Sequence, residues 1–285
     1  MRFSIKKYSL ALILLPLVLL VDAAPKRIIT LNSALTETVF ALGLGSSIVA
    51  TDVTSESPAA AAKLPKVSKN RSVSSEGLIR YRPDIVLAIE GEVPRAVIQQ
   101  LRTAGVKFVA IRQQYSSKGA LNFIQDVANA LGAENQGKTL VNTTQKALQE
   151  VELSIKKQPF SKTPTVLFIY ARGTGTMSVA GKGSSIDEII KLAGAQNAVQ
   201  EFADFKPYTT EALVSANPDI ILMFDFGLSS LGGKEAMLKL PGVRLTNAGK
   251  NKRIIQMNGP LLINFSNRLP EAIRELNSAM KAVYK

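Results

Sequence analysis

One short pattern occurs twice in this chain, and it constrains the fold more than any other feature of the sequence. The first copy is SSEGLIRYRPDIVLA (residues 74–88), and the second is TTEALVSANPDIILM (residues 209–223). Each copy has two hydroxyl residues, a glutamate, a leucine, a Pro-Asp pair and then an aliphatic run. A pattern repeated at this distance predicts two halves built on one structural plan.

Strand and helix patterns alternate around both copies. β-branched and aliphatic runs predict strands at residues 27–32, 47–52, 84–90, 106–111, 165–170, 177–181, 219–224 and 253–258. Segments with helical periodicity separate these runs, such as 94–105 and 118–132. This alternation predicts a mainly parallel sheet in each half, covered by helices on both faces.

The two halves are separated by residues 133–158, which carry a helical pattern without a strand signal. A helix of about 25 residues spans roughly 37 Å, which is about the width of a domain. We therefore expect an N-terminal lobe at 24–132, an interlobe helix at 133–158 and a C-terminal lobe at 159–285. The predicted fold class is α/β, with two doubly wound lobes whose mainly parallel sheets are joined by one long α-helix.

Each copy of the pattern reads as a short capped helix followed by a buried strand. Ser74 and Thr209 are placed to cap the helices, and the Pro-Asp pairs end them before the strands. Glu76 and Glu211 then fall in the first helical turn, where the helix dipole alone favours an acidic residue. Equivalent acids on two lobes also suggest a pair of contacts for a partner with two-fold symmetry.

The N-terminus has the pattern of a secretory signal peptide. Three basic residues precede an apolar run at residues 8–21, which is too short to cross a bilayer comfortably. Residues 21–23 end this run with small side chains at the positions that a signal peptidase reads. We predict a signal peptide at 1–23, a mature chain that starts at Ala24 and a periplasmic location. An uncleaved membrane anchor is the alternative, and the length and ending of the run argue against it.

Two residue types are missing from the whole sequence, and both absences exclude chemistry. Without cysteine the chain can form no disulfide, thiol nucleophile or thiolate metal site, and it has no lipid-accepting cysteine after the apolar run. Without histidine it cannot build a Ser-His-Asp triad or an imidazole-based zinc or iron site.

A Gly-rich GLGSS segment at Gly43 follows a helix instead of a strand, so it does not fit a dinucleotide loop. We therefore expect no enzyme.

The chain is strongly basic, with a formal net charge of +13. Residues 1–23 carry three basic side chains and one acidic side chain, so the predicted mature chain has +11. Such a surface attracts anions in general. A nucleic-acid partner is not expected, because the chain is predicted to be secreted and has no basic run interleaved with aromatic residues.

The chain as a whole resembles the periplasmic substrate-binding proteins of ABC importers. The resemblance is to the class in which a rigid helix joins two α/β lobes and which serves haem, siderophores and corrinoids. It rests on RIITLNSALTETVFALGLGSSIVATD, RSVSSEGLIRYRPDIVLA, SVAGKGSSIDEIIKLAGAQNAV and FKPYTTEALVSANPDIILM. The haem-binding branch matches best, through VSSEG after Arg71, AGKGSS, Leu231-Gly232-Gly233 and Leu240-Pro241-Gly242.

This resemblance implies partners and roles. Glu76 and Glu211 match the positions where each lobe of such proteins forms a salt bridge with arginines of one permease subunit. The implied partner is the permease dimer of an inner-membrane importer, the implied cargo is haem, and the protein is expected to be a monomer with no resident cofactor. A connecting helix is stiff, so we expect only a small rocking of the lobes.

One position departs from the haem-binding branch. That branch usually carries a tyrosine, whose phenolate binds iron, two residues before the arginine, and this chain has Lys69 there. A lysine amine is normally protonated at neutral pH and is a poor iron ligand. Tyr170 and Tyr208 are the alternative iron ligands, and Met177 is a weaker one.

Basic residues near these positions could pair with the propionates of haem or with another carboxylate ligand; they are Lys69, Arg71 and Arg172. The changed axial position leaves two further readings open. The same architecture could bind a ferric siderophore or a corrinoid, or the chain could be a sensor or scaffold that does not transport.

Overall fold

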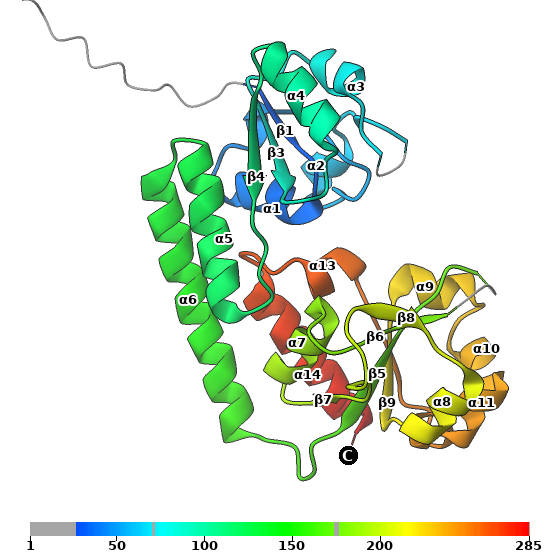
Figure 1. Cartoon of the computed structure of the whole chain (residues 1–285). Helices are drawn as coiled ribbons and strands as arrows, with labels where there is room; N and C mark the ends of the chain where they lie inside the picture. Colours follow the sequence, from blue (N-terminus) through cyan, green and yellow to red (C-terminus); the bar gives the residue numbers. More distant parts are fainter. Residues whose placement is uncertain (1–26, 70–71, 174–176, 285) are drawn as a thin grey trace, which may run out of the picture.

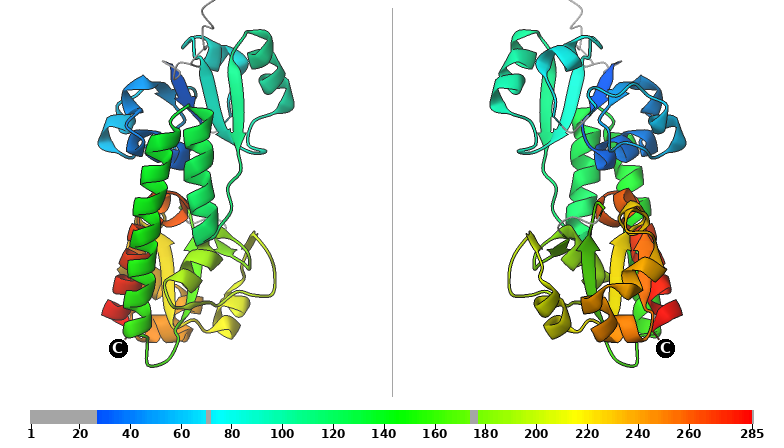
Figure 2. Two further views of the ribbon diagram at one scale, coloured as in Figure 1. Left: turned by 90° about the vertical axis from the view of Figure 1, so that its left-hand side faces the viewer. Right: turned by 90° about the vertical axis from the view of Figure 1, so that its right-hand side faces the viewer.

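The computed structural model describes residues 27–69, 72–173 and 177–284, which form two α/β lobes beside a pair of long helices (Figure 1). The predicted signal peptide and Arg71 lie outside the described residues. The two lobes are stacked end to end, and the C-terminus lies at the far end of the C-terminal lobe (Figures 1 and 2). The predicted α/β class is confirmed.

The N-terminal lobe contains a four-stranded sheet in which every neighbouring pair is parallel. Its order is β2-β1-β3-β4. The strands are β1 (Ile28–Thr30), β2 (Ile48–Thr51), β3 (Ile85–Ile89) and β4 (Lys107–Ile111). The helical elements are α1 (Ser33–Ala41), the 3-10 helix η1 (Gly45–Ser47), α2 (Ala59–Ala62), α3 (Ser75–Ile79) and α4 (Arg95–Thr103). β3 is buried along its whole length because helices cover both faces of the sheet.

The C-terminal lobe contains a six-stranded sheet of order β10-β9-β5-β6-β8, with β7 paired to β5. Its strands are β5 (Thr165–Tyr170), β6 (Ser178–Ala180), β7 (Gln196–Asn197), β8 (Phe205–Pro207), β9 (Ile220–Phe224) and β10 (Ile254–Met257). β9, β10, β5 and β7 are parallel, whereas β6 and β8 are antiparallel to their neighbours. The connection from β5 to β6 is too short for a crossover, so β6 returns as a hairpin partner.

Eight helices of the C-terminal lobe cover this sheet. They are α7 (Ser185–Leu192), α8 (Thr210–Ala216), α9 (Asp225–Ser230), α10 (Lys234–Lys239), α11 (Pro241–Leu245), α12 (Asn247–Lys250), α13 (Gly259–Ile263) and α14 (Leu269–Val283). One face of the sheet packs against α7 and α14, and the opposite face packs against α8 to α12. The side chains of β5 alternate between the two faces, as a strand requires.

Two helices connect the lobes. α6 (Glu134–Lys157) is about 36 Å long and contributes Leu148 and Val151 to the core of the C-terminal lobe. α5 (Ser117–Ala130) lies against α6 throughout (Figures 1 and 2). α5 is also anchored in both lobes, because Ala120 belongs to the C-terminal core and Phe123 to the N-terminal core. Within the described ranges, no helix combines the length and the apolar character needed to span a membrane.

The two copies of the sequence pattern form the same local structure. Ser74 Oγ accepts a hydrogen bond from the backbone N–H of Gly77 at 3.1 Å, and Thr209 Oγ1 accepts one from Ala212 at 3.1 Å. These contacts satisfy backbone donors at the starts of α3 and α8, as the sequence predicts.

The aspartate of each Pro-Asp pair positions the parallel strand beside its own, which is β1 in the N-terminal lobe and β5 in the C-terminal lobe. Asp84 Oδ2 accepts a hydrogen bond from the backbone N–H of Arg27 at 3.0 Å, just before β1. Asp219 Oδ2 accepts one from the backbone N–H of Thr165 at 3.1 Å, at the start of β5. The aspartate of each copy therefore holds the neighbouring parallel strand in register, a role that the sequence pattern alone did not reveal.

Candidate functional site

The carboxyl ends of the parallel strands of each lobe point toward the other lobe (Figures 1 and 2). β1 leads into α1 on the lower side of the N-terminal lobe, and β5 and β9 end on the upper side of the C-terminal lobe (Figure 1). Open α/β sheets bind ligands outside the carboxyl ends of their strands. The facing ends of the two lobes are therefore the first place to look for a binding site.

Three aromatic side chains gather at this end of the C-terminal sheet. Tyr170 ends β5, Phe224 ends β9 and Phe226 lies in the first turn of α9. The ring centroid of Tyr170 is 6.0 Å from both phenylalanine centroids, and those two centroids are 5.4 Å apart. Phe226 is 43% exposed and Tyr170 is half-buried, so this aromatic cluster presents ring surface to solvent.

Arg172 adds a positive charge to the aromatic cluster. Its guanidinium carbon lies 5.5 Å from the ring centroid of Phe226 and 6.0 Å from that of Tyr170. Both distances are within the range of cation–π attraction. The structure thus brings together Tyr170 and Arg172, two of the residues that the sequence predicts for ligand binding.

Tyr208 and Met177 lie elsewhere. Both pack against the core on the α8 to α12 face of the sheet, whereas Tyr170 packs against the opposite face. Tyr208 and Met177 line a small pocket with residues of α8 and β6. The structure therefore separates the two tyrosines that the sequence offers as iron ligands.

The environment of Tyr208 opposes formation of a phenolate. Its hydroxyl donates a hydrogen bond to Glu201 Oε1 at 3.1 Å. Burial, together with the charge and hydrogen bond of Glu201, raises the pKa of Tyr208 to about 12. A phenol that keeps its proton in this way is a poor metal ligand.

The basic residues predicted near the ligand come from different lobes. Lys69 is exposed in the N-terminal lobe, between β2 and α3, whereas Arg172 belongs to the C-terminal lobe. Arg71 lies outside the described residues, so its place near a ligand stays a prediction.

Glu76 and Glu211 are both exposed at the starts of α3 and α8. The two helices lie on different lobes and on the side of the molecule away from α6 (Figures 1 and 2). Hydrogen bonds from its own backbone N–H and from Thr209 lower the pKa of Glu211. Glu211 therefore carries a negative charge throughout the physiological pH range.

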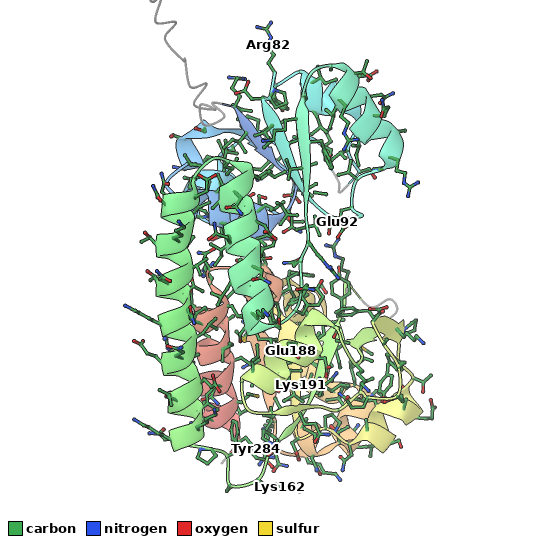
Figure 3. The ribbon with its side chains drawn as sticks, turned by 60° about the vertical axis from the view of Figure 1, so that its left-hand side comes forward. Arg82, Glu92, Lys162, Glu188, Lys191 and Tyr284 are labelled. Carbon is green, nitrogen blue, oxygen red and sulfur yellow. The ribbon has the colours of Figure 1, made fainter. Side chains whose placement is uncertain are left out.

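Sequence reasoning missed several residues at the facing ends. Phe224 was treated as a strand residue and Phe226 was not singled out, although FDF at the end of the strand was a usable sign of aromatics at its carboxyl end. Tyr115 lies in the connection from β4 to α5, is 42% exposed and meets Phe265 edge-on at 5.3 Å. Burial, followed by the charges of Glu92 and Asp204, raises the pKa of Tyr115. Figure 3 places Glu92 on the side of the N-terminal lobe that faces the C-terminal lobe.

A separate open groove of about 590 Å³ lies between β4 and α5. Its rim carries both charge signs, from Glu90, Lys107, Arg112 and Asp126. It contains none of the residues that the sequence predicts for ligand binding. In residues 27–69, 72–173 and 177–284, no cluster of three acidic side chains forms a metal site.

A family model described as periplasmic binding protein matches residues 28–261. The chain belongs to the periplasmic binding protein family. Membership confirms the prediction of a solute-binding protein of the ABC importer type that is not an enzyme. It also indicates a location outside the cytoplasm.

Solved structures of similar chains are described as haem-binding proteins. The periplasmic haem-binding protein BhuT in complex with two haems is 35% identical, with a TM-score of 0.87 over 91% of this chain and 99% of that chain. RhuT from Roseiflexus sp. RS-1 is 32% identical, with a TM-score of 0.86 and the same two coverages. Structures of the haem-binding protein HmuT with a tyrosine or an arginine replaced are 26% and 27% identical, with TM-scores of 0.82 over 91% of this chain and 81% of that chain.

Curated relatives carry other descriptions. An uncharacterised ABC transporter substrate-binding lipoprotein, YvrC of Bacillus subtilis, is 28% identical over 88% of this chain and 79% of its own length. A vitamin B12-binding protein of Vibrio parahaemolyticus is 26% identical over 73% of this chain and 74% of its own length.

Proposed function

We propose that this protein captures haem between its two lobes in the periplasm and delivers it to the permease dimer of an inner-membrane ABC importer. The observation that carries the proposal is the aromatic cluster of Tyr170, Phe224 and Phe226 with Arg172 above it. The exposed ring surface of Phe226 and Tyr170 suits the flat apolar face of a porphyrin, and the guanidinium suits its propionates. The similar haem-binding structures agree with this ligand.

We assign the iron-ligand role to Tyr170 in preference to Tyr208. Tyr170 is the last residue of β5, at the end of the sheet that points toward the other lobe, whereas the Tyr208 hydroxyl is held by Glu201 on the opposite face of the sheet. In the HmuT variants, the replaced tyrosine and arginine are two positions apart, which is the spacing of Tyr170 and Arg172. Met177 packs against the core beside Tyr208 and has no part in the proposed site.

Delivery uses the two exposed acids. Glu76 and Glu211 would each meet arginines of one permease subunit, so that one binding protein spans both subunits. Ion pairs at such an interface set the orientation and the rate of encounter more than the affinity. Lys69 and Arg71 would contribute positive charge toward the carboxylates of the ligand.

The direct experiment is a haemin titration of the mature protein, followed through the Soret band. We expect saturable binding and a shifted band. Tyr170→Phe keeps the ring and removes the oxygen, so it should change the Soret position, whereas the control Tyr208→Phe should leave it unaltered. Absence of saturable binding would remove haem as the ligand.

A corrinoid is the second proposed ligand, because curated relatives are described as vitamin B12-binding proteins and Lys69 replaces the usual tyrosine. A thermal-shift panel with haemin, cobalamin and ferric siderophores separates these readings. Stabilisation by cobalamin or a siderophore alone would replace haem in the proposal.

Uptake measured in a deletion strain separates a transporter from a sensor or scaffold, since only a transporter is needed for uptake.

A further inference from the structure

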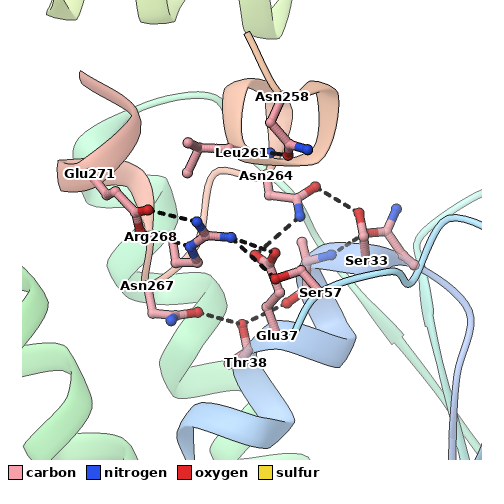
Figure 4. Close-up of polar contacts among 12 residues, drawn as sticks. Ser33, Glu37, Thr38, Ser57, Asn258, Leu261, Asn264, Asn267, Arg268 and Glu271 are labelled. Atoms are coloured by element: carbon pink, nitrogen blue, oxygen red, sulfur yellow. Dashed lines mark hydrogen bonds and ion pairs between the residues drawn. The ribbon is translucent and has the colours of Figure 1, made fainter. Parts of the chain in front are cut away.

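A polar network joins the two lobes directly, in addition to the helical connection. Glu37 of α1 lies opposite Asn264 and Arg268, which belong to the segment between α13 and α14 (Figure 4). Glu37 Oε1 is 3.1 Å from Arg268 Nη1, and Asn264 Nδ2 donates to Glu37 Oε2 at 3.3 Å. Glu37, Asn264 and Arg268 are called the interlobe clasp below.

The carboxylate of Glu37 is buried at the lobe boundary. Its side chain is only 2% exposed, and both hydrogen-bond donors come from the other lobe. A buried carboxylate is tolerated only when it is paired, because removing a charge from water is costly. Separation of the lobes would break this pairing, so Glu37 favours the observed lobe arrangement.

Arg268 is held in a fixed orientation. Its Nε and Nη2 donate to the two carboxylate oxygens of Glu271 at 2.8 and 2.7 Å, within the C-terminal lobe. The remaining Nη1 reaches Glu37 and, at 3.3 Å, Ser57 Oγ of the N-terminal lobe. A two-pronged contact of this kind fixes the guanidinium plane. Hydrogen bonding to Glu271, supported by Glu37 and opposed by burial, raises the pKa of Arg268.

The clasp is physically linked to the aromatic cluster through α13. At the start of this helix, a side-chain carbon on Gly259 would lie 3.5 Å from Phe224 and 3.6 Å from Phe226. Asn264 directly follows the end of the same short helix, and it also accepts a hydrogen bond from Ser33 Oγ at 2.9 Å. One short helix therefore lies beside the cluster at its start and leads directly to a contact with the N-terminal lobe at its end.

We infer that the interlobe clasp holds the two lobes at one separation and thereby slows the release of a ligand held against the aromatic cluster. The three residues act as positioning residues, since none is a member of the cluster. The first part of this inference concerns the ligand-free protein. The second part, retention of the ligand, rests on the proposed function.

The first experiment measures the distance between the lobes in ligand-free protein. The chain has no cysteine, so Arg102→Cys on α4 and Arg244→Cys on α11 give two unique, exposed sites for spin labels. We expect a narrow distance distribution in the labelled parent and a broader one after Glu37→Gln, which removes the charge and keeps the shape. Asn264→Ala, which leaves the ion pair in place, should broaden it less.

Ser266→Ala serves as the matched control, because it removes a buried hydroxyl of the same segment that has no hydrogen-bond partner among the described residues. This variant should leave the distribution narrow. An unchanged distribution in folded Glu37→Gln protein would overturn the inference, and so would equal broadening by Ser266→Ala. If Glu37→Gln fails to fold, the distance distribution of Asn264→Ala is compared with that of Ser266→Ala. Broadening in Asn264→Ala alone supports the inference, and equal widths overturn it.

The second experiment measures haemin dissociation by stopped flow. Loss of the clasp should weaken the coupling between lobe separation and ligand retention, and we expect release to become about tenfold faster in Glu37→Gln. The absorption spectrum of the complex should not change, because the iron ligand is untouched. A broadened distance distribution with unchanged release would refute the retention part. If the parent does not bind haemin at all, the proposed function fails and the distance experiment still decides whether the clasp exists.

Discussion

The two lobes share one structural unit and differ in what surrounds it. In both, a capped short helix carries an exposed glutamate, and an aspartate then fixes the neighbouring parallel strand. The N-terminal sheet contains only parallel strands, whereas the C-terminal sheet adds antiparallel β6 and β8 and carries the aromatic cluster. The shared unit suits a partner with two-fold symmetry, whereas the aromatic cluster of the C-terminal lobe suits an asymmetric ligand.

The largest expected effect comes from reversing the charge of both shared glutamates. Glu76→Lys and Glu211→Lys should each slow haem uptake about tenfold to a similar degree, and the double variant should lower it about a hundredfold, because like charges then face the permease. Uptake assays in the presence of the importer measure this. Glu134→Lys, at an exposed first-turn position of α6, is the matched control. A large difference between the two single variants would break the proposed equivalence of the lobes.

A smaller effect should separate the basic residues of the two lobes. Arg172 lies over the aromatic cluster, whereas Lys69 is exposed in the opposite lobe. We expect Arg172→Ala to weaken haemin binding about thirtyfold and Lys69→Ala about threefold, since charge-assisted contacts are strongest where geometry is fixed. Equilibrium titration gives both values. The reverse order would shift ligand recognition to the N-terminal lobe.

The aspartates of the shared unit should differ modestly in their contribution to stability. Asp219 is half-buried and accepts hydrogen bonds from the backbone and hydroxyl of Thr165 and from Asn247, whereas Asp84 is exposed. Asp219→Ala should lower the free energy of unfolding by about 2 kcal/mol and Asp84→Ala by about 1 kcal/mol. Denaturant unfolding tests this, and equal losses would mean that burial of the aspartate is unimportant.

The smallest effect concerns Tyr208 at alkaline pH. The pKa of this phenol is about 12 in the folded protein, against an ordinary value of 10.0, so the folded state binds its proton more tightly. The resulting stability is complete below pH 10 and is lost as the pH rises through about 12. Tyr208→Phe should therefore make the decline in stability above pH 10 shallower and leave haemin affinity unchanged. A steeper decline would contradict the raised pKa of Tyr208. Weaker haemin binding would contradict the placement of Tyr208 outside the site.

Local patterns predicted much of the fold. The caps at Ser74 and Thr209, the buried strands β3 and β9 and the long helix α6 all follow from residue order and periodicity. The antiparallel return of β6 did not follow, because a three-residue strand carries too little pattern to show its direction. The anchoring of α5 in both lobes was also missed, since apolar periodicity shows which face is buried and not which core covers it.

The site was predicted less completely than the fold. Tyr170 and Arg172 could be named because they lie where a strand ends and a Gly-rich segment begins, but their contacts with Phe224 and Phe226 join segments far apart in sequence. The Glu37–Arg268 pair is likewise a contact between distant segments. Neither residue stands out locally, because a glutamate inside α1 resembles any surface helix residue until its burial is known.

The central claim is that the C-terminal lobe supplies the ligand-recognition surface while both lobes supply docking contacts. A crystal structure of the mature protein with haemin tests the first half most directly. It should show the porphyrin between the lobes, in contact with Phe226, and the Tyr170 oxygen bound to iron. Haem bound in the groove between β4 and α5, or iron held by a residue of the N-terminal lobe with Tyr170 remote, would contradict it.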